Sequence, residues 1–282
     1  MTPFELAEPR TLREAIASLD AKDPSVRPIS GGTALMLMMK AGVLRPSRLV
    51  SLGKLGLARI ETGPHGELRV GAMTPLGVLE RSPLVQRGWP VMARTLRTLS
   101  NVRVRNVATV GGHLAHADPH MDLPPVLSAL GARVTIAGPA GERSVPVEEI
   151  STGYLETSLR LNELITLLEV PPLGGRSAAY LKCTTRSADD WPAVGVAVSL
   201  DFQGDSIREA SVVISAATDR PTRLAAVEKI LRGRKFEQKL LEEAAAQEVE
   251  VESDLHGSAA YKKQLIRVYL RRALHEARAQ SR

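Results

Sequence analysis

The most informative stretch of the sequence is Arg105-Asn106-Val107-Ala108-Thr109-Val110-Gly111-Gly112-His113-Leu114-Ala115-His116. In it, an apolar run leads through a pair of glycines into a predicted helix. A stretch of the same kind, Ile29-Ser30-Gly31-Gly32-Thr33-Ala34-Leu35, occurs near the N-terminus. Glycine permits positive φ and lets an anion approach the backbone without a Cβ in the way. Successive N–H groups at such a turn, with the positive end of the following helix, bind anions. Two such turns that face each other are suited to bind both phosphates of a dinucleotide.

Each glycine pair by itself is equally compatible with a purely structural turn. Neither pair has the G-x-G-x-x-G spacing of the Rossmann fingerprint or the spacing of the P-loop, so the sequence does not support those nucleotide-binding folds.

The chain around the two turns is predicted to form two α/β units. In the first unit, residues 1–55, Thr11 and Glu14 have the spacing of a helix capping box. A short apolar run at 26–29 leads into the glycine turn, a helix follows at about 34–41, and a strand is predicted at 48–52. The second unit, residues 56–173, contains the second turn. Its predicted elements are strands at 67–71, 133–137 and 164–170 and helices at 91–99 and 123–130.

A linker is predicted at Pro171–Gly175, because proline and glycine together stop regular structure. Residues 176–282 beyond it are predicted to form a second domain. Strands at 180–183, 193–202 and 210–216 form a small antiparallel sheet, with a turn at Gln203–Asp205, and helices follow at 223–231, 237–247 and 259–277. The fold class is therefore α/β, more specifically α+β, with domains at 1–173 and 176–282.

The amino-acid composition excludes several classes of function. Aromatic residues make up 3% of the 282 residues, which argues against a stacking platform for single-stranded nucleic acid. Cys183 is the single cysteine, so the chain forms no internal disulfide and holds no iron–sulfur cluster of its own, which normally needs four thiolates. The N-terminus lacks the features of a signal peptide, and the most apolar stretch, 34–44, is too short to span a bilayer, so we expect a cytoplasmic protein.

The formal net charge is +6, and much of it lies near the C-terminus. This charge has three alternative interpretations: a solvated helix face, a surface for an acidic partner subunit, or a surface for nucleic acid. No DNA-binding motif supports the last. The residues concerned are Lys262, Lys263, Arg267, Arg271, Arg272, Arg278 and Arg282.

Three histidines and two aspartates follow the second glycine turn closely enough to raise a metal site as a hypothesis. Pro119 interrupts any helix that would align them, and their spacing fits no H-E-x-x-H pattern, so loop contacts with a ligand or with each other are the favoured interpretation. The residues are His113, His116, Asp118, His120 and Asp122.

The second glycine stretch, extended through Asp118-Pro119 to Asp122-Leu123-Pro124-Pro125, resembles the second FAD-binding motif of the flavoprotein (medium) subunits of the molybdenum hydroxylases. This family includes the medium subunits of carbon monoxide dehydrogenase and of bacterial xanthine dehydrogenase-type enzymes. Ser30–Leu35, with Lys40 after it, is similar to the first motif of that family. Further similarities, in the same order as in the family, occur at 162–165, 180–182, 190–194 and 261–274.

The resemblance implies the two-part FAD-binding fold shared with vanillyl-alcohol oxidase, followed by a C-terminal α/β domain. It places Ser30, Gly31, Gly32, Thr33, Ala34 and Leu35 of the first turn, and Thr109, Gly111, Gly112 and His113 of the second, at the pyrophosphate. It also places Asp122 at the ribose or adenine end and Ile165 by the adenine. His113 departs from the family, which usually has Asn or Asp there.

Lys182 and Trp191 are placed near the isoalloxazine only by the resemblance. A cation beside that ring favours the reduced flavin and raises its potential. From the residues alone, Lys182 would be a surface charge and Trp191 part of the core.

The expected function is that of an FAD-carrying electron-transfer subunit. It would take electrons from [2Fe–2S] clusters in a small subunit, which receives them from a molybdenum cofactor in a large subunit, and pass them to a small-molecule or protein acceptor. The expected assembly is a dimer of heterotrimers, without nucleic acid or a transmembrane segment. The alternatives are a stand-alone flavin reductase or oxidase of the same fold, and a basic RNA- or partner-binding protein.

Overall fold

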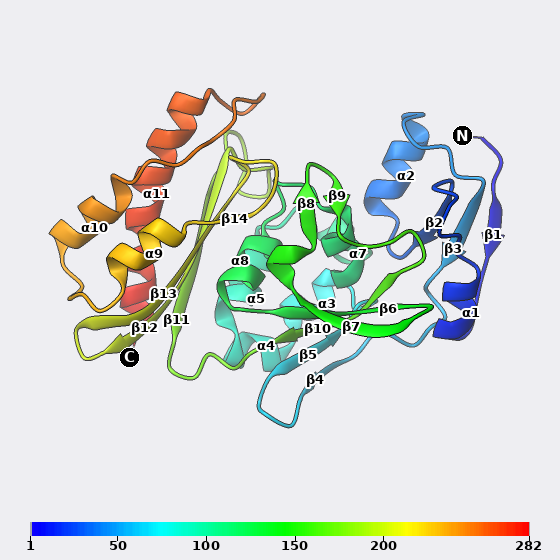
Figure 1. Cartoon of the computed structure of the whole chain (residues 1–282), viewed down its shortest axis with the longest axis horizontal. Helices are drawn as coiled ribbons and strands as arrows, with labels where there is room; N and C mark the ends of the chain where they lie inside the picture. Colours follow the sequence, from blue (N-terminus) through cyan, green and yellow to red (C-terminus); the bar gives the residue numbers. More distant parts are fainter. Residues whose placement is uncertain (1, 282) are drawn as a thin grey trace.

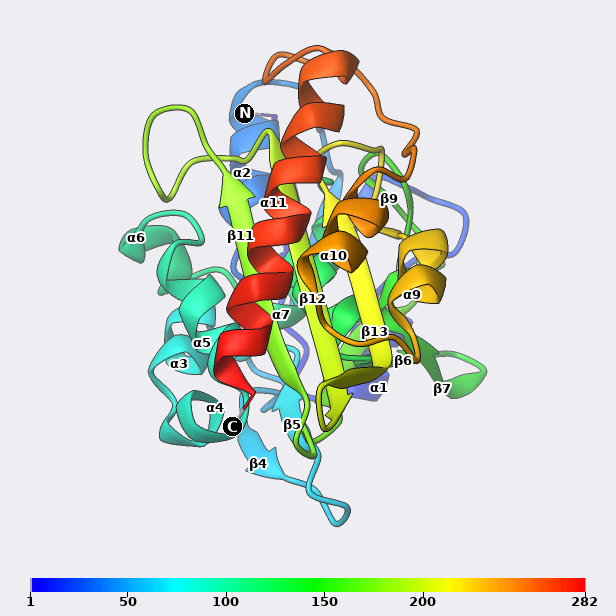
Figure 2. The ribbon, with the colours of Figure 1, turned by 90° about the vertical axis from the view of Figure 1, so that its left-hand side faces the viewer.

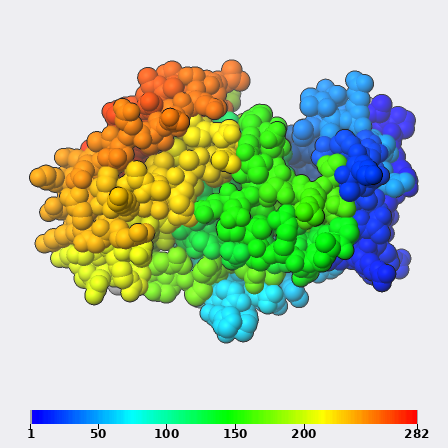
Figure 3. Space-filling view, in the orientation of Figure 1, coloured from blue at the N-terminus to red at the C-terminus, as the bar shows by residue number. Residues whose placement is uncertain are grey.

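The structure is a computed structural model that describes residues 2–281. Three units follow one another along the long axis of the molecule (Figures 1 and 3). We call them the N-terminal unit (2–55), the middle unit (56–173) and the C-terminal unit (176–281).

The N-terminal unit is a three-stranded parallel sheet, in the order β1-β3-β2, with two helices. The capping box is confirmed: the Thr11 hydroxyl accepts a hydrogen bond from the Glu14 N–H (3.2 Å), and the Glu14 carboxylate accepts one from the Thr11 N–H (3.3 Å). The small core of this unit includes Leu164 of the middle unit, so the two units share apolar contacts. The elements are β1 (Glu5–Ala7), α1 (Leu12–Ala17), β2 (Val26–Ile29), α2 (Thr33–Lys40) and β3 (Arg48–Ser51).

The middle unit is an antiparallel sheet, in the order β4-β5-β10-β6-β7, packed against helices through one apolar core. The predicted strand at 164–170 is confirmed as β10, the central strand. The strands are β4 (Ile60–Thr62), β5 (Leu68–Gly71), β6 (Arg133–Gly138), β7 (Gly141–Pro146), the β8 (Ser151–Gly153) and β9 (Glu156–Thr157) pair, and β10 (Leu164–Val170). The helices are α3 (Leu76–Arg81), α4 (Pro83–Gly88), α5 (Pro90–Arg97), α6 (Val102–Arg105), α7 (Val110–His116), α8 (Leu123–Ala129) and the 3-10 turn η1 (Val147–Glu149).

The C-terminal unit is an antiparallel sheet in the order β11-β12-β13-β14, with α11 lying across β11 and β12 (Figure 2). Its other face packs on α8 and α5, since Ala178, Ala197 and Val213 belong to the core of the middle unit. Both faces are therefore covered, which explains the nearly unbroken apolar run 194–200 of β12. The elements are β11 (Ser177–Cys183), β12 (Val194–Gln203), β13 (Ser206–Ser215), β14 (Thr222–Arg223), α9 (Ala225–Leu231), α10 (Gln238–Ala245) and α11 (Ala259–Gln280).

Candidate functional site: two glycine turns and a buried ion pair

The two glycine turns contact each other, as predicted. The Thr109 hydroxyl donates a hydrogen bond to the Ser30 Oγ across the junction between the N-terminal and middle units (3.1 Å). A Cβ on Gly31 would lie 2.1 Å from the carbonyl oxygen of Val107, and a Cβ on Gly112 would lie 2.3 Å from the Ser30 Oγ. Both distances are far below van der Waals contact, so this close approach requires glycine at both positions.

The first turn presents a row of free amide groups. Gly32 has a left-handed conformation (φ 72°) and precedes α2 without a side-chain cap. Among the residues that the structure describes, the N–H groups of Gly31–Leu35 have no hydrogen-bond partner. A helix start with uncapped donors carries a partial positive charge, so this turn has the properties of an anion site.

The second turn differs, and the expectation that both turns offer free N–H groups is wrong there. The Gly111 N–H donates to the Ala72 carbonyl (2.8 Å), the Gly112 N–H to the Thr109 Oγ1 (3.2 Å) and the His113 N–H to the Thr109 carbonyl (2.8 Å). The chain after β5 thus accepts the Gly111 N–H, and Thr109 of the turn itself accepts the other two. The second turn therefore contributes the Thr109 hydroxyl and a closely packed wall rather than an amide row.

His113 is an unusual member of the second turn. Its side chain is 6% exposed, and its Nε2 is buried without a hydrogen-bond partner among the described residues. Burial, together with the nearby His116, lowers the pKa of His113 to about 3. The imidazole is therefore neutral at physiological pH and retains one unused polar atom, which a ligand group can satisfy.

A second group of predicted residues lies where the middle and C-terminal units meet. The Lys182 ammonium of β11 donates to the Asp122 Oδ2 (2.8 Å), and the Tyr180 hydroxyl donates to the Asp122 Oδ1 (2.7 Å). Burial raises the pKa of Asp122, although the Lys182 charge opposes the shift. Tyr180 is not among the predicted site residues, although its i, i+2 spacing from Lys182 places both on one face of the strand.

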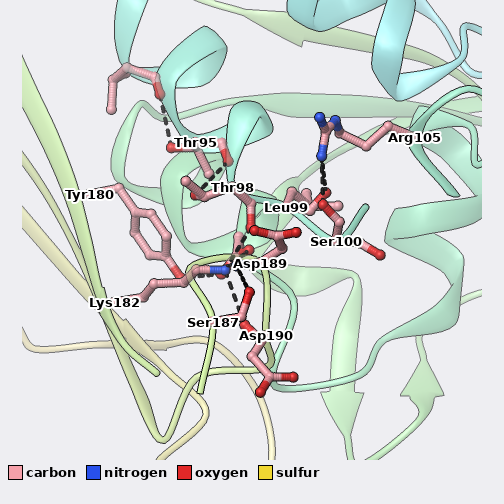
Figure 4. A network of polar contacts seen from close by, with 12 residues as sticks. Thr95, Thr98, Leu99, Ser100, Arg105, Tyr180, Lys182, Ser187, Asp189 and Asp190 are labelled. Carbon is pink, nitrogen blue, oxygen red and sulfur yellow. Dashed lines mark hydrogen bonds and ion pairs between the residues drawn. The ribbon is translucent and has the colours of Figure 1, made fainter. Parts of the chain in front are cut away.

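The Lys182 ammonium also donates to the carbonyls of Thr98 (2.9 Å) and Asp190 (3.1 Å), and Figure 4 shows it pointing toward both segments. Lys182 thus joins the end of α5, the start of α8 and the loop 184–193. Its side chain is only 8% exposed, so the interpretation as a surface charge is wrong. That interpretation failed because the acceptors come from distant segments.

Trp191 is not part of the core either, since it is 55% exposed. Its indole stacks on the His120 imidazole, with ring centroids 5.6 Å apart and planes 15° apart. His120 is held by Asp118 through Nδ1 (3.0 Å) and by Asp254 through Nε2 (3.2 Å). Asp254 had no sequence signal, because it lies in a loop before α11.

The metal hypothesis finds no support between residues 2 and 281, where no group of three or more His, Cys, Asp or Glu side chains is placed to hold a metal ion. Asp118 and His120 contact each other instead, and His113 is isolated by burial. Ile165, predicted at the adenine, lies in β10 within the apolar core of the middle unit.

The basic C-terminal segment is only partly a solvated face. Lys262 is 1% exposed, and its ammonium contacts Asp254 (2.7 Å) and donates to the Ala216 carbonyl (2.7 Å). Lys263 and Arg267 are exposed on α11 as expected. Over residues 2–281, no helix combines the length and apolar character that crossing a bilayer requires.

Two family models match the chain. The first, described as the FAD binding domain in molybdopterin dehydrogenase, matches residues 2–173, and the second, described as the carbon monoxide dehydrogenase flavoprotein C-terminal domain, matches residues 179–277.

Relatives match over nearly their whole length. The glyceraldehyde dehydrogenase medium chain of Sulfolobus acidocaldarius is 31% identical, covering 97% of this chain and 98% of the relative. The nicotine 6-hydroxylase medium subunit of Paenarthrobacter nicotinovorans is 30% identical, covering 98% and 97%. A solved structure of carbon monoxide dehydrogenase from Hydrogenophaga pseudoflava, which lacks the Mo-pyranopterin moiety of its molybdenum cofactor, superposes with a TM-score of 0.94 at 30% identity, covering all of both chains.

The touching glycine turns, the mixed α/β architecture and the matches to both halves agree with the resemblance seen in the sequence. The chain belongs to the family of FAD-binding medium subunits of molybdenum hydroxylase complexes and is an oxidoreductase subunit.

Proposed function

We propose that the chain binds FAD with its diphosphate against the first glycine turn. The observation that carries this proposal is the row of free N–H groups from Gly31 to Leu35, which lies beside the Ser30 and Thr109 hydroxyls. An anion with several oxygens satisfies these donors together. The Thr33 and Ala34 amides belong to the same row. In this arrangement Gly111 and Gly112 allow the second turn to pack closely against the first.

His113 fits the same cofactor. A neutral imidazole with a free, buried nitrogen is able to donate or accept one hydrogen bond, depending on its tautomer. We propose that the His113 Nε2 contacts a polar group of the bound FAD, in place of the Asn or Asp amide or carboxylate usual in the family.

We propose that Lys182 and Trp191 lie near the isoalloxazine, Asp122 toward the ribose or adenine end, and Ile165 by the adenine. The contact of Lys182 with the loop that carries Trp191 supports a common region for these two residues. The direct contact between Lys182 and Asp122 (2.8 Å) puts Asp122 in that region too, so its assignment to the ribose or adenine end is supported by the family resemblance alone. Both Asp122 oxygens already accept hydrogen bonds, so a ribose contact requires Asp122 to share an acceptor with Tyr180 or Lys182. Bound FAD supplies the redox centre, and these residues position it and set its potential.

The finer assignment is a subunit between an iron–sulfur partner and an external acceptor. We propose that electrons arrive from [2Fe–2S] clusters of a small subunit and leave to a small-molecule or protein acceptor, with the molybdenum cofactor in a large subunit. The proposed assembly is a dimer of heterotrimers in the cytoplasm, with domain boundaries at 1–173 and 176–282. Cys183 as the single cysteine supports placing the clusters in another chain.

The experiment is to purify the chain alone and co-expressed with its neighbouring subunits, and to record the visible spectrum and subunit content. We expect flavin absorption and a complex that contains iron–sulfur and molybdenum subunits. Flavin absorption in a chain that reduces or oxidises a substrate without any partner would support the stand-alone flavoenzyme instead. Absence of flavin from both the chain and the complex, after reconstitution with FAD, would overturn the proposal.

A further inference from the structure

A hollow of about 330 Å³ lies between the start of α5, the segment from Leu173 to Ala178 and the end of α11. Figure 2 shows the end of α11 beside β11, with α4 and α5 next to it. None of the residues lining this hollow belongs to the glycine turns or to the Asp122–Lys182 pair. It is therefore separate from the proposed FAD site.

Two arginines line the hollow, and neither forms an ion pair with a carboxylate among the described residues. The Arg94 Nη2 donates to the Ala178 carbonyl (3.4 Å) and to the Gln280 Oε1 (2.5 Å). Arg176 donates from Nε to the Leu173 carbonyl (3.1 Å) and from Nη2 to the Pro172 carbonyl (3.0 Å). Backbone and amide oxygens thus fix both guanidinium groups, without an ion pair to any carboxylate of residues 2–281.

The charges around Arg94 are mixed. The Glu276 carboxylate of α11 stabilises the Arg94 charge, and the Arg97 charge, which lies in α5 like Arg94, destabilises it. Glu276 receives a hydrogen bond from the Gln280 Nε2 (3.4 Å), and no hydrogen bond joins it to Arg94 among the described residues. Among residues 2–281, Arg94 therefore has one acidic neighbour, Glu276, and one basic neighbour, Arg97, while Arg176 adds a further positive charge to the wall of the hollow.

Ser177 provides an observation independent of the charges. Ser177 is among the residues that line the hollow and is 4% exposed, and its Oγ is buried without any hydrogen-bond partner among the described residues. An unpaired buried hydroxyl is costly, and native proteins usually satisfy it with protein, water or ligand. The hydroxyl is an unused donor next to two unpaired cations.

The helix α5 adds a third feature, because its first residues Pro90 and Val91 form part of the wall. The N-terminus of a helix carries a partial positive charge. The helix start adds only this partial charge, because Pro90 has no N–H and the Met92 N–H donates to the Trp89 carbonyl (3.0 Å). The two arginines and the hydroxyl are the usual hydrogen-bond partners of a phosphate or carboxylate group. The volume lies at the lower end of the range for small-molecule sites of about 300–1,000 Å³, so it has room for more than a bare ion.

We propose that this hollow is a second binding site, for a small organic anion that presents a phosphate or carboxylate group to Arg94, Arg176 and Ser177. It holds its ligand at the contact between the middle and C-terminal units, because α5 belongs to one and β11 with α11 to the other. The site does not require that the glycine turns bind FAD.

The test is isothermal titration of the FAD-saturated full chain with glycerol 3-phosphate and, separately, with citrate, at constant ionic strength set with KCl. Glycerol 3-phosphate represents ligands with a phosphate group, and citrate represents ligands with a carboxylate group. The compound that binds more strongly identifies which of the two groups the site prefers. We expect saturable binding of at least one of them. Absence of saturable binding of both would overturn the proposal.

Variants locate the binding. Ser177→Ala removes a hydroxyl that has no partner, so we expect an unchanged melting temperature but about tenfold weaker anion binding, the size of one hydrogen bond to a charged group. Arg94→Gln and Arg176→Gln should each weaken binding by at least tenfold, whereas Arg267→Gln, on an exposed part of α11, should not. Unchanged affinity in Ser177→Ala and Arg176→Gln would overturn the proposal even if Arg94→Gln fails to fold.

A Gly112→Ala variant separates this inference from the proposed FAD site. Anion binding at the hollow should persist in it, because Gly112 is not among the residues that line the hollow. Loss of anion binding in Gly112→Ala, with a normal melting temperature, would place the anion at the glycine turns and contradict the second site.

Discussion

Gly112 is the glycine of the second turn at which an added Cβ would meet side-chain atoms alone. Its missing Cβ would lie 2.3 Å from the Ser30 Oγ and 3.0 Å from the Thr109 Oγ1, both side-chain atoms. Gly111 instead approaches Ala72, including its backbone oxygen at 3.1 Å, so a substitution there disturbs the fold. Gly112 is therefore the better position for testing cofactor binding without loss of the structure.

We predict that Gly112→Ala binds FAD at least tenfold more weakly, while its melting temperature stays within a few degrees of the wild type, about the shift from 1 kcal/mol. The added methyl displaces the Ser30 hydroxyl from the junction of the turns. Titration of the apoprotein with FAD, followed by flavin fluorescence, gives the affinity. In a Ser30→Ala background the same substitution should cost less, since the clash is gone. Wild-type affinity in Gly112→Ala would contradict the proposed binding of the FAD diphosphate at the glycine turns.

His120 gives a prediction about pH. Burial lowers its pKa, but hydrogen bonds and charges of Asp118 and Asp254 outweigh burial and raise the pKa above its usual range. The other groups in the cluster are His256 and Trp191, whose rings pack on the imidazole, and Lys262, which shares Asp254. Because the folded protein binds this proton more tightly, the stabilisation is complete below the unfolded pKa and is lost as pH rises through the folded pKa.

We therefore expect the difference in unfolding free energy between wild type and His120→Gln to be largest below about pH 6 and to shrink as pH rises above about 6.5. Urea unfolding of both proteins at several pH values measures this difference. His113 has the opposite effect: its folded pKa of about 3 means that the unfolded chain binds the extra proton, so His113 destabilises the fold as pH falls. A wild-type minus His120→Gln difference that grows with pH would show that His120 is not held as a cation.

Among the elements, α11 shows how neighbouring lysines of one basic segment take different roles. Lys262 is buried against Asp254 and the Ala216 carbonyl, whereas Lys263 is exposed. We predict that Lys262→Met destabilises the protein by about 2–4 kcal/mol, because Asp254 loses its ammonium partner and the buried Ala216 carbonyl loses its donor. Lys263→Met should change stability by less than about 0.5 kcal/mol. Chemical denaturation compares the two, and equal effects would refute the assignment of Lys262.

The elements that the sequence predicts well are those with a periodic apolar pattern or a recognisable cap. The strand at 164–170 and the turn at 203–205 are confirmed because a buried central strand and a Gly-containing hairpin leave clear signals. Strands β1, β4, β8 and β9 were not predicted, since they are two or three residues long and mostly exposed. The pairing of β1 also depends on a distant partner, since Glu5 pairs with Arg48 of β3.

The residues of the candidate site also differ in whether the sequence predicts them. Local sequence suffices to predict the glycine turns, since each turn is one contiguous stretch. It does not reveal that Ala72 accepts a hydrogen bond from the second turn, or that Asp254 contacts His120, because these contacts link segments 39 and 134 residues apart. Burial of Lys182 likewise depends on acceptors from three other segments.

At the scale of the whole molecule, Lys182 and Asp122 connect the middle and C-terminal units through a pair that is nearly inaccessible to solvent, at 8% and 5% exposure. We predict that Lys182→Met lowers the unfolding free energy by about 3–5 kcal/mol, because Asp122 is left buried and unpaired. The double variant Lys182→Met with Asp122→Asn should recover part of this loss, since no buried charge remains. Additive losses, measured by urea unfolding, would show that the pair does not couple the two units.

We propose that the open amide row at Gly31–Leu35 receives the FAD diphosphate where the N-terminal and middle units meet. Hydrogen–deuterium exchange of the full chain with and without FAD tests it most directly, because it reports on those N–H groups. We predict strong FAD-dependent protection of the peptide covering residues 31–35, and little change at Gly111–His113, whose amides are already bonded. Bound FAD that leaves exchange at 31–35 unchanged would contradict the account.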